Sequence, residues 1–215
     1  MTQFSNLEAI QFSKTKLLKW AAIQIYYYLI AADGEISEKE MESFLEIAKE
    51  TDSLFKQYKS QLIEECENQV KKAIEEEKRC AVLKEGIDLV YRDQLNEILH
   101  GLEEKSGHIN ANMFIWNMLS IAMSDGTYAD EESELIHYVV RKFDLDQEVF
   151  LELDNAMKTI LDIDQSIAWM TQKENPFVIK GTNWEISSSE IGRFIDEFTN
   201  RREVILNSVK EMTKD

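Results

Sequence analysis

The chain is poor in proline, glycine and cysteine. Its 215 residues include one proline, seven glycines and two cysteines. So few turn-forming residues leave little room for the many tight turns of a sheet-rich fold, so a mostly helical fold is predicted. Cys66 and Cys80 have no second pair with which to complete a metal-binding set. We therefore expect two buried, reduced thiols and a cytoplasmic location.

Positive charge is scarce as well. Against 41 Asp and Glu residues stand only 24 Lys and Arg, and the formal net charge is −17. An extended phosphate-binding surface needs clustered basic residues, so a nucleic-acid partner is not expected. Such acidity favours a bound cation or a basic partner, and it is also the ordinary charge of a solvated helical surface.

Long hydrophobic runs are absent. Residues 20–32 are apolar apart from Gln24, but a membrane-spanning helix needs about 20 such residues. The first residues are neither basic nor followed at once by an apolar run, which argues against a signal peptide. The sequence thus predicts no transmembrane segment, and it predicts residues 20–32 as part of a buried central helix.

Two short acidic corners have nearly the same sequence. Residues 33–40 read DGEISEKE and residues 125–132 read DGTYADEE, 92 positions later (125 − 33). Each follows an apolar run and precedes an amphipathic one. Self-similarity of this kind points to one structural unit used twice. We interpret it as a duplicated helix-corner-helix.

The hydrophobic pattern around the corners predicts an all-α helical bundle. The repeats are expected over about 16–48 and 110–153, with a long, charged helical insert over about 52–100. The first helix should cover about 6–32, and a helix over about 147–160 should be followed by a short one ending near Met170. The bundle, residues 1–160, would precede an appendage, residues 161–215, with a β-hairpin at 177–186 and a closing helix.

The corners do not match a working EF-hand, although an Asp-Gly turn followed by a glutamate suggests one. In that register the first two ligand positions would be Leu29 and Ala31 in one copy, and Ile121 and Met123 in the other. None of these side chains carries an oxygen. A working EF-hand is therefore not expected.

The pattern instead resembles the tellurite-resistance TerB family and its TerB-like relatives. The resemblance rests on an apolar helix ending in Asp-Gly, an acidic helix start and a second copy, clearest at residues 121–132 and 138–146. It implies an all-helical domain with an acidic site suspected of binding divalent metal. It also implies a role in stress or phage-related membrane complexes, which leaves peripheral association with such a complex open.

Four carboxylates are the candidate metal ligands. Carboxylate oxygens suit Ca²⁺, Mg²⁺ or Mn²⁺. On a helix of about 100° per residue, Glu132 shares the sector of Leu135 and Val139, so its side chain should point inward, where a carboxylate is costly unless it is paired. The alternative is that these residues only cap their helices. The candidate ligands are Asp33, Glu40, Asp125 and Glu132, flanked by Glu38 and Asp130, with Gly34, Gly126 and Ser37 as structural corner residues.

Other constellations are set aside. The pairs Glu97/His100 and Glu134/His137 have di-iron spacing, but their helical phase turns them away from the apolar stripes. No nucleophile set or phosphate loop is present. We expect a non-enzymatic module that binds a divalent cation, a partner protein or both. A purely structural interaction domain and a carboxylate-metal enzyme are the alternatives.

Overall fold

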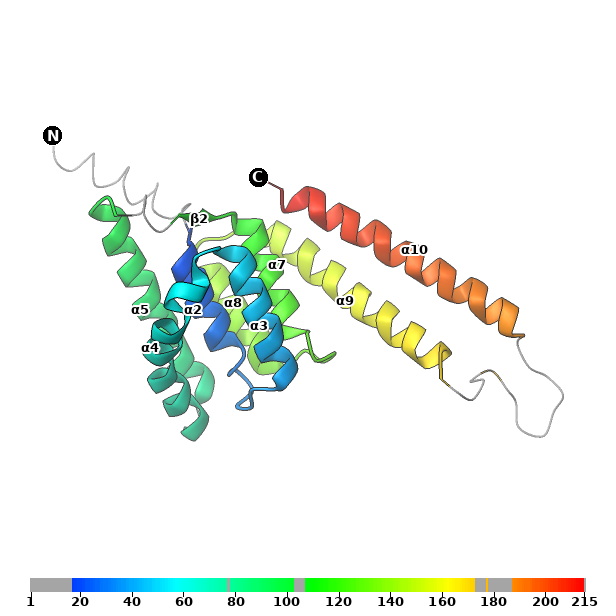
Figure 1. The fold of residues 1–215 in the computed structure, drawn as a ribbon, viewed down its shortest axis with the longest axis horizontal. Helices are drawn as coiled ribbons and strands as arrows, with labels where there is room; N and C mark the ends of the chain where they lie inside the picture. The colour runs from blue at the N-terminus through cyan, green and yellow to red at the C-terminus, as the bar shows by residue number, and fades with distance from the viewer. Residues whose placement is uncertain (1–16, 77, 103–106, 173–176, 178–186, 215) are drawn as a thin grey trace.

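The predicted all-α fold is confirmed. The computed structural model describes residues 17–76, 78–102, 107–172, 177 and 187–214, and in this part of the chain it contains eight helices and one two-stranded sheet (Figure 1). In chain order the elements are β1 (Leu17–Leu18), α2 (Lys19–Leu29), α3 (Glu38–Thr51), α4 (Phe55–Glu75), α5 (Arg79–Leu99), β2 (His108–Ile109), α7 (Ala111–Ala122), α8 (Asp130–Lys142), α9 (Gln147–Met170) and α10 (Ser188–Met212).

The duplication is three helices long. The starts of α2 and α7, of α3 and α8, and of α4 and α9 are each separated by the same 92 positions as the corners. The helix α4 is therefore the third helix of the first repeat, as α9 is of the second. The offset thus extends past the predicted repeat bounds and into the segment interpreted as an insert.

Helix α2 is the centre of the bundle, as its apolar sequence predicts. Residues 21–32 are all at least nine-tenths buried except Gln24, and α2 packs against α3, α4, α5, α7 and α8. An apolar circumference requires neighbours on every side, which these five helices provide. Tyr26 stacks on Phe114 of α7 with ring centroids 5.5 Å apart, and its hydroxyl accepts from Asn117 Nδ2 (3.1 Å).

Two helix predictions need correction. Leu17 and Leu18 form β1, which pairs antiparallel with β2, so the helix predicted over residues 6–32 is interrupted there and its described helical part begins at Lys19; residues 1–16 lie outside the described part. The charged segment 52–100 is helical as predicted, and it forms two antiparallel helices, α4 and α5. The two shorter helices predicted between residues 147 and 170 are one helix, α9, because Ile160, Ile163 and Met170 continue its buried stripe.

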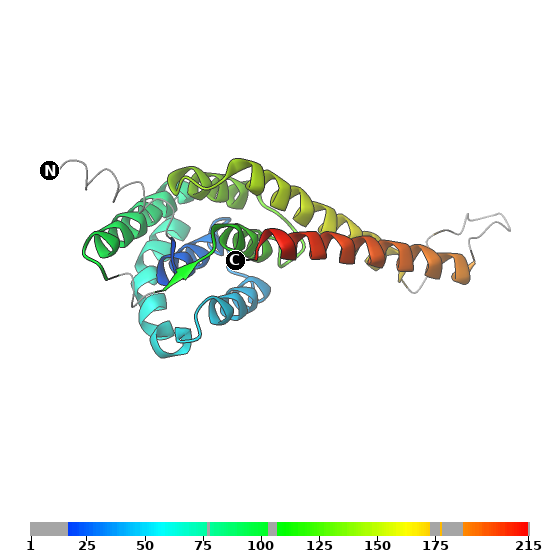
Figure 2. The ribbon, with the colours of Figure 1, turned by 90° about the horizontal axis from the view of Figure 1, so that it is seen from above.

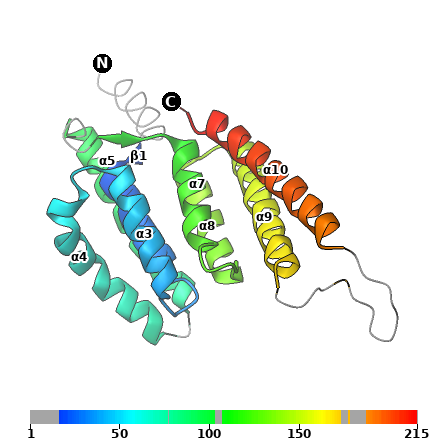
Figure 3. The same cartoon turned by 45° about the vertical axis from the view of Figure 1, so that its right-hand side comes forward.

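Helices α9 and α10 lie side by side (Figure 3) and form a long hairpin that extends away from the bundle (Figures 1 and 2). The closing helix is confirmed: Ser187 and Glu190 form the predicted capping box at the start of α10. The end of α10 returns to the bundle, where Asn112 Nδ2 donates to the carbonyl of Met212 (2.8 Å). The predicted β-hairpin at 177–186 lies outside the described residues, apart from Phe177.

Among the helices of the described residues, none is long and apolar enough to cross a membrane. Both cysteines are free; Cys66 is buried as predicted, whereas Cys80 is half-exposed near the start of α5.

Candidate functional site

The first corner, residues 30–37, joins α2 to α3. Asp33 Oδ1 accepts from the backbone N–H of Glu35 (3.0 Å), a turn that aspartate favours. Gly34 has φ +98°, a conformation that disfavours any side chain. Ser37 and Glu40 then form the predicted capping box, with Glu40 Oε2 2.7 Å from Ser37 N and Ser37 Oγ 3.1 Å from Glu40 N.

The second corner, residues 123–129, repeats this geometry with one difference. Asp125 Oδ1 accepts from the backbone N–H of Thr127 (2.8 Å) and from its hydroxyl (2.7 Å), and Gly126 has φ +95°. Glu132 Oε2 accepts from the N–H of Ala129 (2.8 Å). Alanine has no side-chain oxygen with which to return the bond, so Glu132 caps its helix alone.

Glu40 and Glu132 are both buried, with exposed fractions of 5 % and 3 %. The inward direction predicted for Glu132 is thus confirmed. Burial raises the pKa of Glu132 to about 8; the N–H of Ala129 opposes this, and the charges of Glu40, Asp33 and Asp125 add to it. Burial also raises the pKa of Glu40, and the negative charges of Asp33 and Asp125 raise it further. The four predicted carboxyl groups therefore lie within electrostatic range of one another.

The flanking candidates do not join this group. Glu38 and Asp130 are exposed first-turn residues of α3 and α8. Neither is among the charges that raise the pKa of Glu40 or Glu132. Their carboxylates are placed to interact with the positive ends of their helix dipoles.

The two corners have different neighbours, which the sequence did not indicate. At the first, Arg79 of α5 donates through Nη1 to the carbonyl of Asp33, and its guanidinium covers Gly34. At the second, Gln165 Nε2 of α9 donates to the carbonyl of Gly126 (3.3 Å). A basic residue holds the first corner and a neutral one the second, so the second corner keeps more of its negative charge.

We expect alanine at the two corner glycines to have unequal effects. At Gly126, where no described atom would lie within 4 Å of a new Cβ, alanine should lower the free energy of unfolding by about 1 kcal/mol through backbone strain. At Gly34 the Cβ would lie 2.5 Å from Arg79 Cζ. Losing the arginine contact as well should bring the cost to about 2 kcal/mol.

Urea unfolding of the two variants measures this difference. In an Arg79→Ala background the cost of Gly34→Ala should fall to that of Gly126→Ala, because the obstructing side chain is gone. An unchanged difference between the two glycines in that background would contradict the role given to Arg79.

The four carboxylates do not form a ready-made metal-binding group. Within the described residues, no three His, Cys, Asp or Glu side chains are close enough together to hold an ion. Each candidate carboxylate uses one oxygen for a backbone N–H, and its other oxygen accepts no hydrogen bond from a described residue. The site thus offers four carboxylate oxygens that could bind a cation. The carboxylates repel one another when no cation is bound.

The Glu-x-x-His pairs serve other contacts. Glu97 accepts from Trp20 Nε1 (2.7 Å), and Glu134 forms an ion pair with Lys84. His100 and His137 are exposed, as their helical phase predicts.

Comparison with known families identifies one whose pattern covers the described bundle. The sequence pattern of the family described as "Tellurite resistance protein TerB" matches residues 19–155, more than half of the chain. No curated protein and no solved structure gave a match. The matched range begins at the first residue of α2 and includes both corners, and the chain belongs to the TerB family.

Proposed function

We propose that this chain is a non-enzymatic TerB module that binds a divalent cation at its paired acidic corners and engages a partner protein. Family membership suggests a setting in a bacterial stress response of the tellurite or phage-defence type. Ca²⁺, Mg²⁺ and Mn²⁺ are the cations whose chemistry fits carboxylate donors.

The observation that carries the proposal is the burial of the Glu132 carboxyl group beside other carboxylates. An ionised carboxylate at 3 % exposure beside three others is costly. Either a proton or a cation can neutralise it. Asp33, Glu40, Asp125 and Glu132 would hold the ion through the oxygens that their backbone hydrogen bonds leave free, with water completing the shell.

Thermal unfolding of metal-stripped protein, with and without each cation, tests cation binding. At about 100 times its dissociation constant, a ligand specific for the folded state adds about 2.7 kcal/mol of stability. We expect the melting temperature to rise, and the rise to be lost in an Asp33→Asn/Asp125→Asn double variant. The matched control, Glu38→Gln/Asp130→Asn, removes two nearby charges and should keep it.

A second candidate is a structural module whose corners only cap helices. The hydrogen bonds that each carboxylate accepts from a backbone N–H of its own corner favour it. In that case the Asp33/Asp125 variant should melt earlier by the same amount with and without cation. The absence of any cation effect on the wild-type protein would refute the cation half of the proposal.

An enzymatic role is less well supported. A carboxylate-metal enzyme of the di-iron type needs histidines that project into the bundle. His100 and His137 project outward.

A further inference from the structure

The hairpin of α9 and α10 continues beyond the shared TerB domain. The family pattern ends at residue 155, whereas α9 continues to Met170 and α10 follows it. Ile160 and Ile163 are buried, yet they do not belong to the main hydrophobic core of the bundle. The distal hairpin therefore has a small apolar seam of its own.

The seam follows a regular spacing along α10. Buried or half-buried positions recur at intervals of four and three residues, as in coiled coils. Seven of the nine such positions in α10 follow this spacing, namely Ile191, Ile195, Phe198, Arg202, Ile205, Val209 and Met212; half-buried Gly192 and Leu206 adjoin it. Arg202 Nε donates to Asp164 Oδ1 of α9 (2.8 Å), which fixes the register of the two helices. Two helices packed in this way cover only one side of each other.

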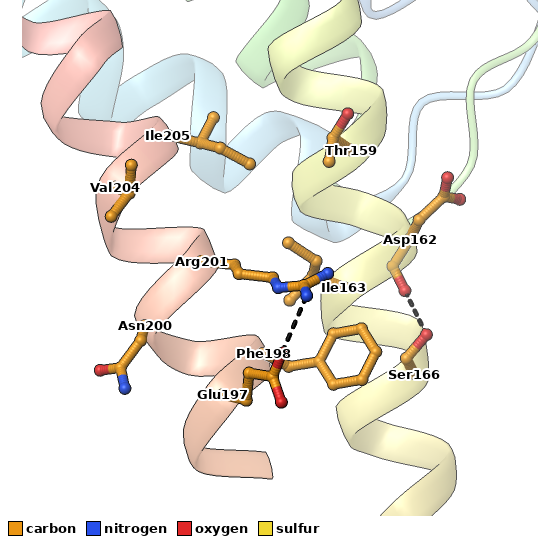
Figure 4. Close-up of a pocket in the computed structure, with 10 residues that line it drawn as sticks. All are labelled: Thr159, Asp162, Ile163, Ser166, Glu197, Phe198, Asn200, Arg201, Val204 and Ile205. Atoms are coloured by element: carbon orange, nitrogen blue, oxygen red, sulfur yellow. Dashed lines mark hydrogen bonds and ion pairs between the residues drawn. The ribbon is translucent and has the colours of Figure 1, made fainter. Parts of the chain in front are cut away.

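An apolar groove runs along one flank of this hairpin. Its central part has a volume of about 580 Å³, and Figure 4 shows Phe198, Arg201 and Ile205 of α10 extending toward α9, where Thr159 and Ile163 line the opposite wall. A smaller hollow adjoins it at each end. The hollow near Trp169 shares Ser166 and Phe198 with the central part, and the hollow near Glu152 shares Thr159 and Val204 with it. We call this continuous feature the hairpin groove.

The dimensions and walls of the hairpin groove suit a helix. Glu152 to Trp169 of α9 are 18 residues, and the 17 steps between them span about 26 Å at 1.5 Å per residue. Its walls include large apolar side chains that water reaches: Val204 is 69 %, Trp169 45 % and Phe194 42 % exposed. An amphipathic helix of about 17 residues would cover this length as the third member of a bundle.

The rim of the hairpin groove is acidic. Glu152 and Asp162 are exposed on the α9 side, and neither has an ion-pair partner among the described residues. On the α10 side, Arg201 is already paired with Glu197 (2.8 Å). The uncompensated charge of the rim is therefore negative, in line with the net charge of −17.

We propose that the hairpin groove binds an amphipathic helix of a partner protein whose apolar stripe is flanked by Lys and Arg. Basic flanks would pair with Glu152 and Asp162 while the stripe covers Val204 and Phe198. A second copy of this chain is the weaker occupant, because it would bring the same acidic flank and a like net charge to the interface. The inference rests on the partner-binding half of the proposed function and is independent of cation binding.

Fluorescence anisotropy with two labelled 18-residue peptides tests the proposal in the absence of divalent cations. One peptide carries leucines at helical spacing with lysines elsewhere, and the other has glutamate in place of every lysine. We expect the lysine peptide to bind the full chain and the glutamate peptide not to. Val204→Asp should weaken binding of the lysine peptide at least about tenfold, because burial of an apolar side chain is lost.

The control variant is Leu89→Asp, at a 46 % exposed leucine of α5 outside the hairpin groove. Both variants add one negative charge, so electrostatic attraction to the lysine peptide rises equally in both. Equal binding by both variants would refute the proposal, since it would show attraction by net charge alone. It would also be overturned if the wild-type protein sedimented as a dimer and Val204→Asp as a monomer, because the occupant would then be a second copy.

Discussion

Replacing Phe44 by alanine is expected to lower the free energy of unfolding by about 4 kcal/mol, the usual cost of removing a buried phenylalanine. The Phe44 side chain has no exposed surface. Its ring makes edge contacts with Tyr27 of α2 (5.5 Å between centroids) and with Phe55 of α4 (6.0 Å). One side chain thus joins all three helices of the first repeat, and the cavity left behind would be lined by two rings that cannot close it.

Chemical denaturation followed by circular dichroism measures the effect. Phe194→Ala is the matched control, because Phe194 is 42 % exposed on the distal hairpin, and its loss should cost well under about 1 kcal/mol. A loss of similar size in both variants would contradict the assignment of Phe44 to the centre of the core.

Metal-free protein is expected to lose stability between about pH 5 and pH 8, and Glu132→Gln should remove much of this loss. The pKa of Glu132 is raised from 4.5 when unfolded to about 8 when folded. In that window the folded chain holds a proton that the unfolded chain does not. The stabilisation is complete below the unfolded pKa and is lost as the pH rises through the folded one, by about 3 kcal/mol from pH 5 to pH 8.

Glutamine is the informative substitution because its amide oxygen can still accept from Ala129 N–H and its volume is unchanged. Urea unfolding at a series of pH values would give the free energy of unfolding against pH for the wild type and for the variant. The difference between the two curves is the contribution of Glu132, separate from that of the other carboxylates. Wild-type protein should match the variant at pH 5, where Glu132 is protonated, and fall about 3 kcal/mol below it at pH 8. Parallel curves would show that Glu132 ionises at the same pH in the folded and unfolded chain.

Much of the fold could be predicted because the spacing of apolar residues and the residue types at helix ends determine where helices form. The apolar circumference of residues 20–32 specified a central helix, and Ser37 with Glu40 specified a helix start. The inward direction of Glu132 followed from its helical phase relative to Leu135 and Val139. These inferences need only neighbours in the sequence, and the structure agrees with each.

Other features depend on distant partners. Strands of two residues such as Leu17–Leu18 leave no periodic signal and exist only because His108–Ile109 lies alongside. The full length of the repeat was hidden because α4 and α9 differ where they face the protein: buried Leu62 and Cys66 correspond, at an offset of 92, to Asp154 and Lys158. The helix starts coincide while the side chains do not.

At the corners, too, contacts with distant partners could not be predicted from the sequence. Asp33, Glu40, Asp125 and Glu132 could be found because their spacing repeats. Arg79 and Gln165 could not, because each reaches its corner from another helix across a tertiary contact. A sequence pattern indicates which residues share a role, but the residues that make two copies unequal come from the packing.

The continuity of α9 affects where this protein can be cut. The family pattern stops at residue 155, in the middle of a helix whose next turns carry buried Met157 and Ile160. A fragment ending there would have a frayed terminus and an uncovered apolar end on α7, so it should precipitate. The sounder design for a minimal fragment retains α10, whose returning end contacts the first turn of α7 through Asn112.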